Sequence, residues 1–416
     1  MADVLTDVLE ELRAATGGDA WEATEADVVD GVPARWVVRP HSTEETSAVV
    51  RAAAAHGLTL VARGAGTKLA WGAAPERVDV ILDTTGLDAV VEHAAGDLIC
   101  VVGAGCPLES LQSQLSGAGQ RLGIDDRRNG TVGGAVATAA TGPMRLHHGS
   151  VRDLVIGMTL VRADGVVAHA GGKVVKNVAG YDLGKLLTGS YGTLGVITEV
   201  AFRLHPVSGA RRWVTTALDS TDAVQDRVLA VTHAQFVPSA VELDRSREGA
   251  TLSLLLEGVP PGVEQRTAQA LELLGPGATS SEEAPDWWAA EPEGSTGVLV
   301  KVTHEIAALA QLLAALDRAA ESAGVVPVLR GSPVVGTALV ALDGDVDAPA
   351  LAAFVADLRS AQHRFGGSVV VLEAPSVLKE GLDVWGPVGG LDLMRAVKAQ
   401  FDPERRLAPG RFVGGI

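Results

Sequence analysis

Apolar and polar positions in the first half of the chain follow the periods of short strands and capped helices. A helix is predicted within "RPHSTEETSAVVRAAAAHG", because Ser42 or Thr43 can cap it and Gly57 ends it. Apolar runs predict buried strands at 58–62 and 78–84, two strands around the turn Gly96-Asp97, and a helix that begins at Pro107. These elements together predict an α/β domain.

The pattern changes after 205–209, where the sequence reads "HPVSG". Strands are predicted within "RRWVTTAL", "TLSLLLEG", "VLVKVTH", "GTALVALDG" and "GSVVVLEAP". They alternate with helices predicted at 219–234, 262–274, 305–322 and 348–363. This order predicts an α+β domain with an antiparallel sheet and helices on one face. The predicted division is 1–207, 208–385 and a C-terminal segment, 386–416, that returns to the first domain.

Composition and charge exclude several classes of protein. The net charge is −17 and 47% of residues are hydrophobic. An acidic chain does not favour non-specific binding to nucleic acid or anionic lipid. The two cysteines, Cys100 and Cys106, support neither a disulfide framework nor a cysteine metal site, so buried thiols are expected. The acidic N-terminus is unlike a signal peptide, and no apolar run reaches the roughly 18 residues of a membrane helix. The expected protein has no integral membrane segment and is cytoplasmic, or peripheral to the inner membrane through a complex.

Two small-residue segments are candidates for binding. The first, "ARGAGTK", places Gly64 and Gly66 between Arg63 and Lys68. Glycines allow backbone N–H groups to converge on an anion, and the neighbouring cations and Thr67 can add donors. The second, 129–142, holds almost only small residues, which allow the backbone to approach a ligand. Each segment alone could equally be an ordinary turn.

The common dinucleotide and nucleotide fingerprints are absent from the sequence. The segment "CVVGAGCPLESL" has Leu108 where G-x-G-x-x-G requires its last glycine, and no Walker loop is present. A nicotinamide enzyme is therefore the weakest interpretation. The glycines of "GSYGTLG" at 189–195 indicate a tight turn and specify no chemistry alone.

Taken in order, several motifs resemble the flavoproteins with the vanillyl-alcohol-oxidase-type (PCMH) FAD-binding domain. They are "ARGAGTK", "TVGGAVATAATG", "HHGSVRDLVIGMTLVRADG", "KNVAGYDLGKLLTGSYGTLGVITE" and "FDPERRLAPGRF". The resemblance covers roughly 36–207 and 391–412. Within that family the chain is most similar to the FAD-binding subunit of bacterial glycolate oxidase. This resemblance implies two α/β subdomains that hold FAD and an α+β cap domain.

The resemblance also implies which residues bind FAD. The first loop would hold the pyrophosphate, the second would contact it and run beneath the flavin, and other motif positions would approach the ring or donate to it. The residues implied are Arg63, Gly64, Ala65, Gly66, Thr67, Lys68, Thr131, Val132, Gly133, Gly134, Ala137, Thr138, Gly142, His148, Gly149, Ile197 and Arg411. Thr67 and Lys68 stand where some relatives carry a flavin-linking histidine, and no cysteine lies near 141–153, so non-covalent FAD is expected.

The chain departs from the family in its catalytic residues. Relatives that oxidise 2-hydroxy acids carry a cap-domain motif H-x-G-D-G-N-x-H, whereas here His233, His304 and His363 are scattered. Ala408 also replaces the family's asparagine before Pro-Gly. No catalytic residue is assigned. Polar candidates with either a site or a structural role are Asp125, Asp126, Arg127, Arg128, Arg145, His147, Lys176, Asn177, Tyr181 and Arg330.

Three functions are compatible with these observations. The first is an FAD-binding subunit of a glycolate oxidase or dehydrogenase that acts on a small 2-hydroxy acid with a larger FAD-binding catalytic subunit and an iron–sulfur subunit. The second is a non-catalytic FAD-bound scaffold, which the missing histidine motif and the Trp287–Trp288 loop favour. The third is a stand-alone FAD-dependent alcohol oxidoreductase with an unidentified base.

Overall fold

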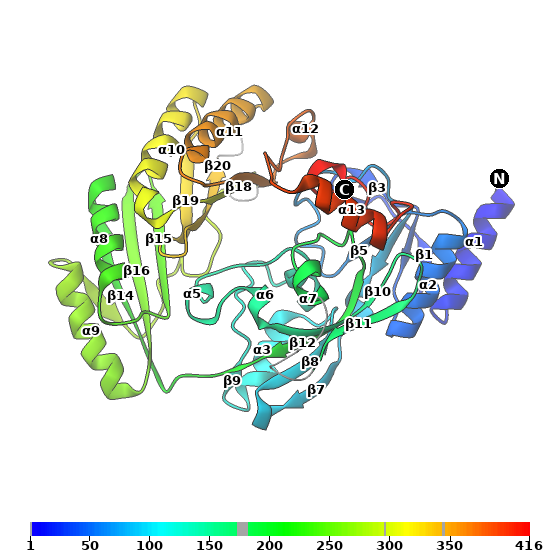
Figure 1. Cartoon of the computed structure of the whole chain (residues 1–416), viewed down its shortest axis with the longest axis horizontal. Coiled ribbons are helices and arrows are strands. Elements are labelled where there is room, and N and C mark those ends of the chain that lie inside the picture. The colour runs from blue at the N-terminus through cyan, green and yellow to red at the C-terminus, as the bar shows by residue number, and fades with distance from the viewer. Residues whose placement is uncertain (1, 173–181, 295–296, 343–345) are drawn as a thin grey trace. The chain divides into compact units, whose positions relative to one another are not determined.

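The chain folds into two compact units, described here from a computed structural model (Figure 1). The structure describes residues 2–172, 182–294, 297–342 and 346–416. The first unit contains residues 1–141, 149–207 and 387–416, and the second contains 142–148 and 208–386. Grouping of 142–148 with the second unit has no signal in the sequence pattern.

The first unit is built on two sheets. One has the strand order β1-β4-β6-β5, in which β4, β6 and β5 are parallel and β1 is antiparallel. The other has the order β11-β10-β12-β8-β7 and is antiparallel throughout. Their bounds are β1 (Ala20–Glu22), β4 (Trp36–Val38), β5 (Leu60–Arg63), β6 (Val80–Asp83), β7 (Val90–Ala94), β8 (Ile99–Gly103), β10 (Val155–Val161), β11 (Val167–Gly171) and β12 (Val196–Arg203). Two small ladders pair β2 (Val28–Val29) with β3 (Val32–Pro33) and β9 (Gln120–Arg121) with β13 (His205–Pro206).

Helices of the first unit pack against these sheets and carry the predicted capping residues. The Ser42 hydroxyl accepts from the Glu45 N–H at the start of α2, as its sequence predicts. Each of the two sheets has its own buried apolar cluster, with Val80 and Leu82 in one and Val200 and Phe202 in the other. The helices are α1 (Ala2–Ala15), α2 (Thr43–Ala55), α3 (Leu108–Ser116), α4 (Val132–Ala137), α6 (Val151–Leu154), α7 (Leu183–Leu187) and α13 (Leu391–Phe401), with 3₁₀ turns η1 (Thr84–Gly86), η2 (Ala95–Asp97) and η4 (Val413–Gly415).

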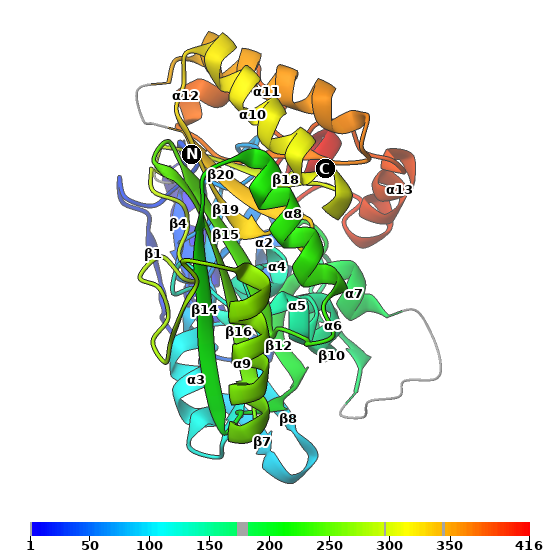
Figure 2. The same cartoon turned by 90° about the vertical axis from the view of Figure 1, so that its left-hand side faces the viewer.

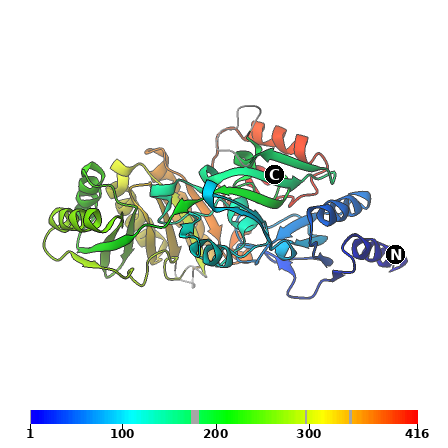
Figure 3. The ribbon, with the colours of Figure 1, turned by 90° about the horizontal axis from the view of Figure 1, so that it is seen from below.

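The second unit is an eight-stranded antiparallel sheet with the order β17-β14-β16-β15-β19-β20-β18-β21. Helices α8 and α9 lie on the same side of this sheet, in front of β14 and β16 in Figure 2. The same two helices are green in Figure 3. Helix α10 packs against α8 and α11. The strands are β14 (Ala210–Leu218), β15 (Ala240–Ser246), β16 (Gly249–Gly258), β17 (Thr279–Ser281), β18 (Val298–Thr303), β19 (Pro327–Ser332), β20 (Thr337–Leu342) and β21 (Val369–Glu373). The helices are α5 (Arg145–His148), α8 (Thr221–His233), α9 (Pro260–Leu274), α10 (Leu309–Ala323), preceded by η3 (Ile306–Ala308), α11 (Ala348–His363) and α12 (Ser376–Lys379).

The α+β class with a large antiparallel sheet is therefore confirmed. The sequence pattern predicts no strand at the positions of β15 and β19, nor at that of β17, which forms within the Gly- and Glu-rich segment 275–297. A second difference concerns the small-residue segment at 129–142, of which 132–137 is a helix rather than a loop. Thr131 explains it, because its hydroxyl accepts from the Gly134 N–H and caps the helix. Across the described residues, no helix is both long and apolar enough to cross a bilayer.

Candidate functional site

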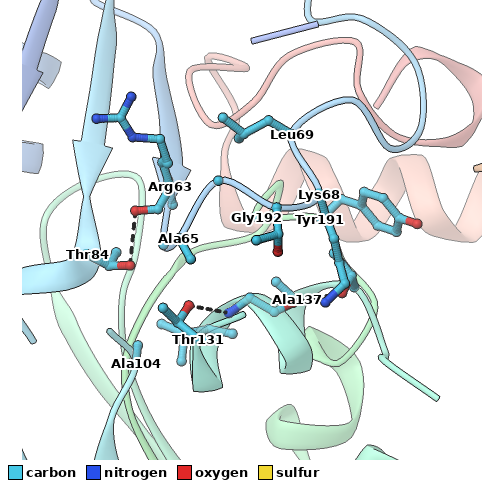
Figure 4. Close-up of a pocket in the computed structure, with 18 of the residues that line it drawn as sticks. Arg63, Ala65, Lys68, Leu69, Thr84, Ala104, Thr131, Ala137, Tyr191 and Gly192 are labelled. Atoms are coloured by element: carbon cyan, nitrogen blue, oxygen red, sulfur yellow. Dashed lines mark hydrogen bonds between the residues drawn. The ribbon is translucent and has the colours of Figure 1, made fainter. Parts of the chain in front are cut away.

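A pocket within the first unit gathers residues from both small-residue segments and from more distant parts of the chain (Figure 4). The loop that follows β5 lies opposite the start of α4, and the ends of β6 and β8 close one side. The lining residues are Ala62, Arg63, Gly64, Ala65, Gly66, Thr67, Lys68, Leu69, Thr84, Ala104, Thr131, Gly133, Gly134, Ala137, Thr138, Tyr191, Gly192, Gly195, Ile197 and Arg411.

The loop after β5 presents backbone donors. Within the described residues, the N–H groups of Ala65, Gly66, Thr67 and Lys68 have no hydrogen-bond acceptor. Gly66 has a φ of +78°, which turns the backbone in a way that favours glycine. Consecutive N–H groups in such a turn form a concave site for an anion. The prediction that this loop can receive a phosphate therefore has a geometric basis.

The two cations of this loop are held by carboxylates. Arg63 Nη1 donates to Asp27 Oδ1 at 2.8 Å, and its Nη2 lies 3.4 Å from Asp83 Oδ2. Figure 4 shows the Arg63 guanidinium directed away from Thr131 and Ala137. Lys68 Nζ donates to Asp126 Oδ1 at 3.0 Å. The backbone of the loop is thus the main source of donors, in contrast to the prediction that the Arg63 and Lys68 side chains would add to it.

The second small-residue segment, 129–142, contributes to the shape of the pocket rather than hydrogen-bond donors. The N–H groups of Val132 and Gly133 already donate to Cys106 O and Ala104 O, and that of Gly134 to the Thr131 hydroxyl. Gly64 has no side chain, and a Cβ there would overlap the Thr131 hydroxyl. The first loop can therefore lie directly on the start of α4. Small residues here allow a ligand to approach the backbone closely.

The glycine-rich turn at 189–195, whose spacing alone specifies no chemistry, contributes three residues to the pocket lining. The Tyr191 N–H donates to Ala137 O, which ties the turn to α4. Tyr191 has a φ of +55°, an uncommon value for a residue with a side chain, and its ring contacts Phe412. Burial raises the pKa of Tyr191 well above its usual value, although the Arg411 charge opposes this rise. The neutral phenol is therefore the form present at neutral pH.

Arg411 lines the pocket as expected from the C-terminal motif. It is 4% exposed, and its Nη2 donates to Leu69 O at 2.7 Å and to Trp71 O at 2.8 Å. Burial lowers the pKa of Arg411, and the nearby Tyr191 and Asp30 oppose this change. Its side chain joins the C-terminal segment to the loop after β5.

Thirteen of the seventeen predicted FAD residues line this pocket. Val132 does not, because its side chain is fully buried in the core of the first unit. Gly149 is outside the lining, and Gly142 and His148 belong to the second unit. Missed residues are Ala62, Leu69, Thr84, Ala104, Tyr191, Gly192 and Gly195, of which the glycine spacing at 189–195 gave the only sequence signal.

The other polar candidates have mixed outcomes. Asp126 accepts a hydrogen bond from Lys68 Nζ, and Arg128 Nη1 donates to Thr67 O at 3.0 Å, so both residues hold the first loop in place. Arg330 is 4% exposed and its Nε donates to Asp244 Oδ1 at 2.6 Å, which supports a structural role. Lys176, Asn177 and Tyr181 lie outside the described residues.

The described part of the chain contains no group of three or more His, Cys, Asp or Glu residues that could hold a metal ion. His304 is buried, its Nδ1 lies 2.9 Å from Glu305 O, and burial lowers its pKa. Both cysteines are buried, as expected, and burial raises the pKa of the Cys100 thiol to about 11. Burial raises the pKa of the Cys106 thiol as well, which disfavours the reactive thiolate form of both residues.

Parts of the chain match known FAD-binding protein families. Residues 34–171 match the family described as "FAD binding domain", and residues 383–412 match "FAD linked oxidases, C-terminal domain". A D-lactate dehydrogenase of Archaeoglobus fulgidus is 38% identical over 41% of this chain and 38% of its own length. Glycolate oxidase subunit GlcD of Bacillus subtilis is 30% identical over 50% of this chain and 44% of its own. Glycolate oxidase subunit GlcE of Escherichia coli is 40% identical over 30% of this chain and 37% of its own.

The chain therefore spans less than half the length of these relatives in each match. Among solved structures, p-cresol methylhydroxylase has a TM-score of 0.76 at 18% identity, over 98% of this chain and 96% of its own. That likeness shows the fold. Both family matches name FAD, and the pocket offers unused N–H donors beside a surface of small residues, which fits a pyrophosphate and a flat ring. The protein is a flavoprotein with the PCMH-type FAD-binding fold.

Proposed function

We propose that the chain is an FAD-dependent oxidoreductase that acts on a small 2-hydroxy acid, with glycolate as the first candidate, as one subunit of a glycolate oxidase-like complex. The pocket of the first unit is the observation that carries this proposal. Its free N–H groups from Ala65 to Lys68 suit the FAD pyrophosphate, and α4 suits the ring system. The first unit is then the FAD-binding domain and the second is the cap.

FAD would supply the acceptor for the hydride that a 2-hydroxy acid loses on oxidation. The protein's own residues would hold the cofactor by the backbone of the first loop, by α4 and by the Tyr191 turn. We propose that this binding is non-covalent, because the loop position used by some relatives for a histidine link holds Thr67 and Lys68. No cysteine is present at 141–153 either.

The substrate class is supported by the names of the relatives. Lactate and glycolate are both 2-hydroxy acids, and the matched relatives are a D-lactate dehydrogenase and two glycolate oxidase subunits. The H-x-G-D-G-N-x-H motif is absent from this sequence. A partner flavoprotein that carries this motif, with an iron–sulfur protein as electron acceptor, would complete the reaction.

The first experiment measures cofactor and substrate together. Purified protein is expected to be yellow, to release intact FAD when denatured with acid, and to oxidise glycolate or D-lactate with an artificial electron acceptor once the partner flavoprotein is added. A colourless protein that takes up no FAD would contradict the proposal. Full activity of the lone chain would favour a stand-alone oxidoreductase.

A non-catalytic scaffold is the second candidate. It is favoured by Arg330, a buried cation in the sheet of the second unit, because this side chain is occupied by Asp244 and by Glu291 O rather than open to a substrate. The catalytic and the scaffold function are distinguished by chemical removal of FAD from this subunit alone, followed by reassembly of the complex. Unchanged turnover of the complex would support the scaffold, and lost turnover would support a redox role.

A further inference from the structure

A hollow of about 500 Å³ lies within the first unit, between α13 and the last turn, η4 (Figure 1). It shares no lining residue with the cofactor pocket, and its size is that of a ligand pocket, roughly 300–1,000 Å³. One side of α13 lines it, because Arg395, Lys398 and Ala399 recur at helical spacings of three and four. Arg405 and Glu76 also line the hollow.

Arg405 lines the hollow from an unusual backbone conformation. Its φ is +52°, in the left-handed region that residues with a side chain seldom adopt. Nη2 of its guanidinium donates to Glu76 Oε1 and to Gly415 O, both at 2.7 Å, so the group is held in place. Its Nε and Nη1 atoms have no acceptor among the residues that the structure describes. Strained residues of this kind are concentrated at functional sites.

Arg395 brings a second guanidinium to the same hollow. Among the described residues, its only polar contact joins Nη1 to Asp392 Oδ1 at 3.5 Å, which is longer than an ordinary hydrogen bond. Asp392 is fully exposed and lies outside the lining of the hollow, so water screens this ion pair. Most of the donors of Arg395 are therefore available to a ligand.

The lining of the hollow carries more positive than negative charge. Its two acids already have partners in the lining. Glu76 accepts from Arg405, and Asp402 accepts from Lys398. Arg395 is the cation that remains. Since the chain as a whole has a net charge of −17, this positive excess is not the general character of its surface. A concave site with such an excess attracts an anion.

We propose that this hollow binds a small organic anion, whose carboxylate or phosphate head accepts hydrogen bonds from Arg395 and Arg405. The planar guanidinium group suits both heads, because it can donate two parallel hydrogen bonds to either. Ala399, Pro403 and Ile416 give the hollow an apolar part, which favours an organic anion over an inorganic one. The site does not depend on the proposed substrate or on partner subunits.

The hollow is connected to the cofactor pocket through its own residues. Lys398 Nζ donates to Thr193 O, in the glycine-rich turn that lines that pocket. Arg405 belongs to the same segment as Arg411, which also lines the pocket. An anion that joins Arg405 to α13 holds this segment in place and therefore tightens FAD binding, and FAD tightens the binding of the anion by the same factor.

The test of the site uses the full FAD-loaded chain. Butyl phosphate and butyrate are the two organic anions, and butyramide is their neutral counterpart; calorimetry gives the Kd of each. Arg395→Met removes the guanidinium, and Arg395→Lys keeps the charge without the planar group. Arg203→Met, which removes an exposed cation from the end of β12 in the same unit, is the control.

We expect at least one of the two anions to bind, and comparison of their Kd values identifies the preferred head. Arg395→Met should weaken that binding about 10-fold and Arg395→Lys about threefold, whereas Arg203→Met should leave it unchanged. Failure of both anions to bind the wild type, or an equal Kd for the wild type and Arg395→Met, would overturn the site. Butyramide that binds as tightly as the anions would overturn it as well, because charge would then have no role.

A separate titration tests the connection with FAD. FAD affinity of the FAD-free full chain, measured by quenching of flavin fluorescence, should rise about fivefold when the preferred anion is present at saturation. The rise should disappear in Arg395→Met and persist in Arg203→Met. An unchanged FAD affinity in the wild type would overturn the connection. A rise of the same size in Arg395→Met would place the anion elsewhere on the chain and overturn the site.

Discussion

Lys68 and Asp126 are 58 positions apart in sequence, and their ion pair joins the loop after β5 to the segment that precedes α4. Both side chains are almost fully buried, with exposed fractions of 9% and 4%. Asp126 also accepts from the N–H groups of Arg128 and Gly130. One carboxylate therefore holds the two segments that line the pocket in a fixed relation.

Replacement of Asp126 by asparagine should loosen this relation. Asparagine can still accept from backbone N–H groups, but it gives Lys68 only a neutral partner, and hydrogen bonds to charged groups contribute about 1.5–3 kcal/mol. We expect Asp126→Asn to weaken FAD binding about 10-fold, measured by quenching of flavin fluorescence. Asp97→Asn, at an exposed position of the same unit, is the control. Equal FAD affinity of both variants would show that the ion pair does not shape the pocket.

Gly64 should tolerate no side chain. A Cβ at this position would overlap the Thr131 hydroxyl, so the first loop would have to move away from α4. We expect Gly64→Ala to abolish measurable FAD binding and to lower the free energy of unfolding by about 1–3 kcal/mol, as overpacking does. Gly96→Ala is the matched control, because nothing lies within 4 Å of a Cβ built there. FAD binding by Gly64→Ala at wild-type affinity would contradict the close approach of the two segments.

How much of this site the sequence predicts depends on how local each feature is. The donor loop is local, since Gly64 and Gly66 lie within one short run, and it was predicted. The partners of Arg63 were not predicted, because Asp27 and Asp83 lie 36 and 20 positions away and only the fold brings them together. Tyr191 was missed for a similar reason, as its turn gains its role by contact with α4.

Prediction of the fold also depends on how local each feature is. Capped helices such as α2 and the strands of the antiparallel sheet carry their signals in a single window of sequence. The sequence predicts no helix at 132–137 because glycine and alanine give no amphipathic period, and only the Thr131 cap marks this segment as a helix. Contacts between distant segments, such as that of α5 with β15, have no local signal at all.

Asp83 should make stability depend on pH. Burial raises the pKa of this carboxyl, but hydrogen bonds from Thr85 and Arg39 outweigh burial and hold it below its usual value. The folded pKa is thus lower than the unfolded value of about 3.9, so ionised Asp83 stabilises the protein above about pH 4, and this contribution is lost as the pH falls through the folded pKa.

The variant Asp83→Asn tests this dependence. We expect it to lower the free energy of unfolding by about 1.5–3 kcal/mol at pH 7 and by clearly less at pH 3. Urea unfolding at the two pH values gives both quantities, and Asp88→Asn, at an exposed position, should show no such difference. An equal loss at both pH values would mean that the charge of Asp83 is not what stabilises the fold.

Lys398 should be the most sensitive residue of the C-terminal segment. Its Nζ donates to Asp402 Oδ2 and to Thr193 O, both at 2.7 Å, and to Leu407 O at 2.9 Å, so α13 is tied to the turn that lines the pocket. The side chain of Lys398 is 5% exposed and that of Asp402 is fully buried. Removal of one partner of a buried ion pair leaves an uncompensated charge and costs about 3–5 kcal/mol.

We therefore expect Lys398→Met to lower the free energy of unfolding by about 3–5 kcal/mol, measured by urea denaturation of the FAD-free chain. Arg395→Met removes an exposed cation from the same helix, where the ion pair with Asp392 is open to solvent, and should cost less than about 1 kcal/mol. The double variant Lys398→Met/Asp402→Asn should recover part of the loss, because the stranded charge is gone. Similar losses for Lys398→Met and Arg395→Met would show that burial of this pair contributes little, and that backbone contacts alone hold α13 to the pocket turn.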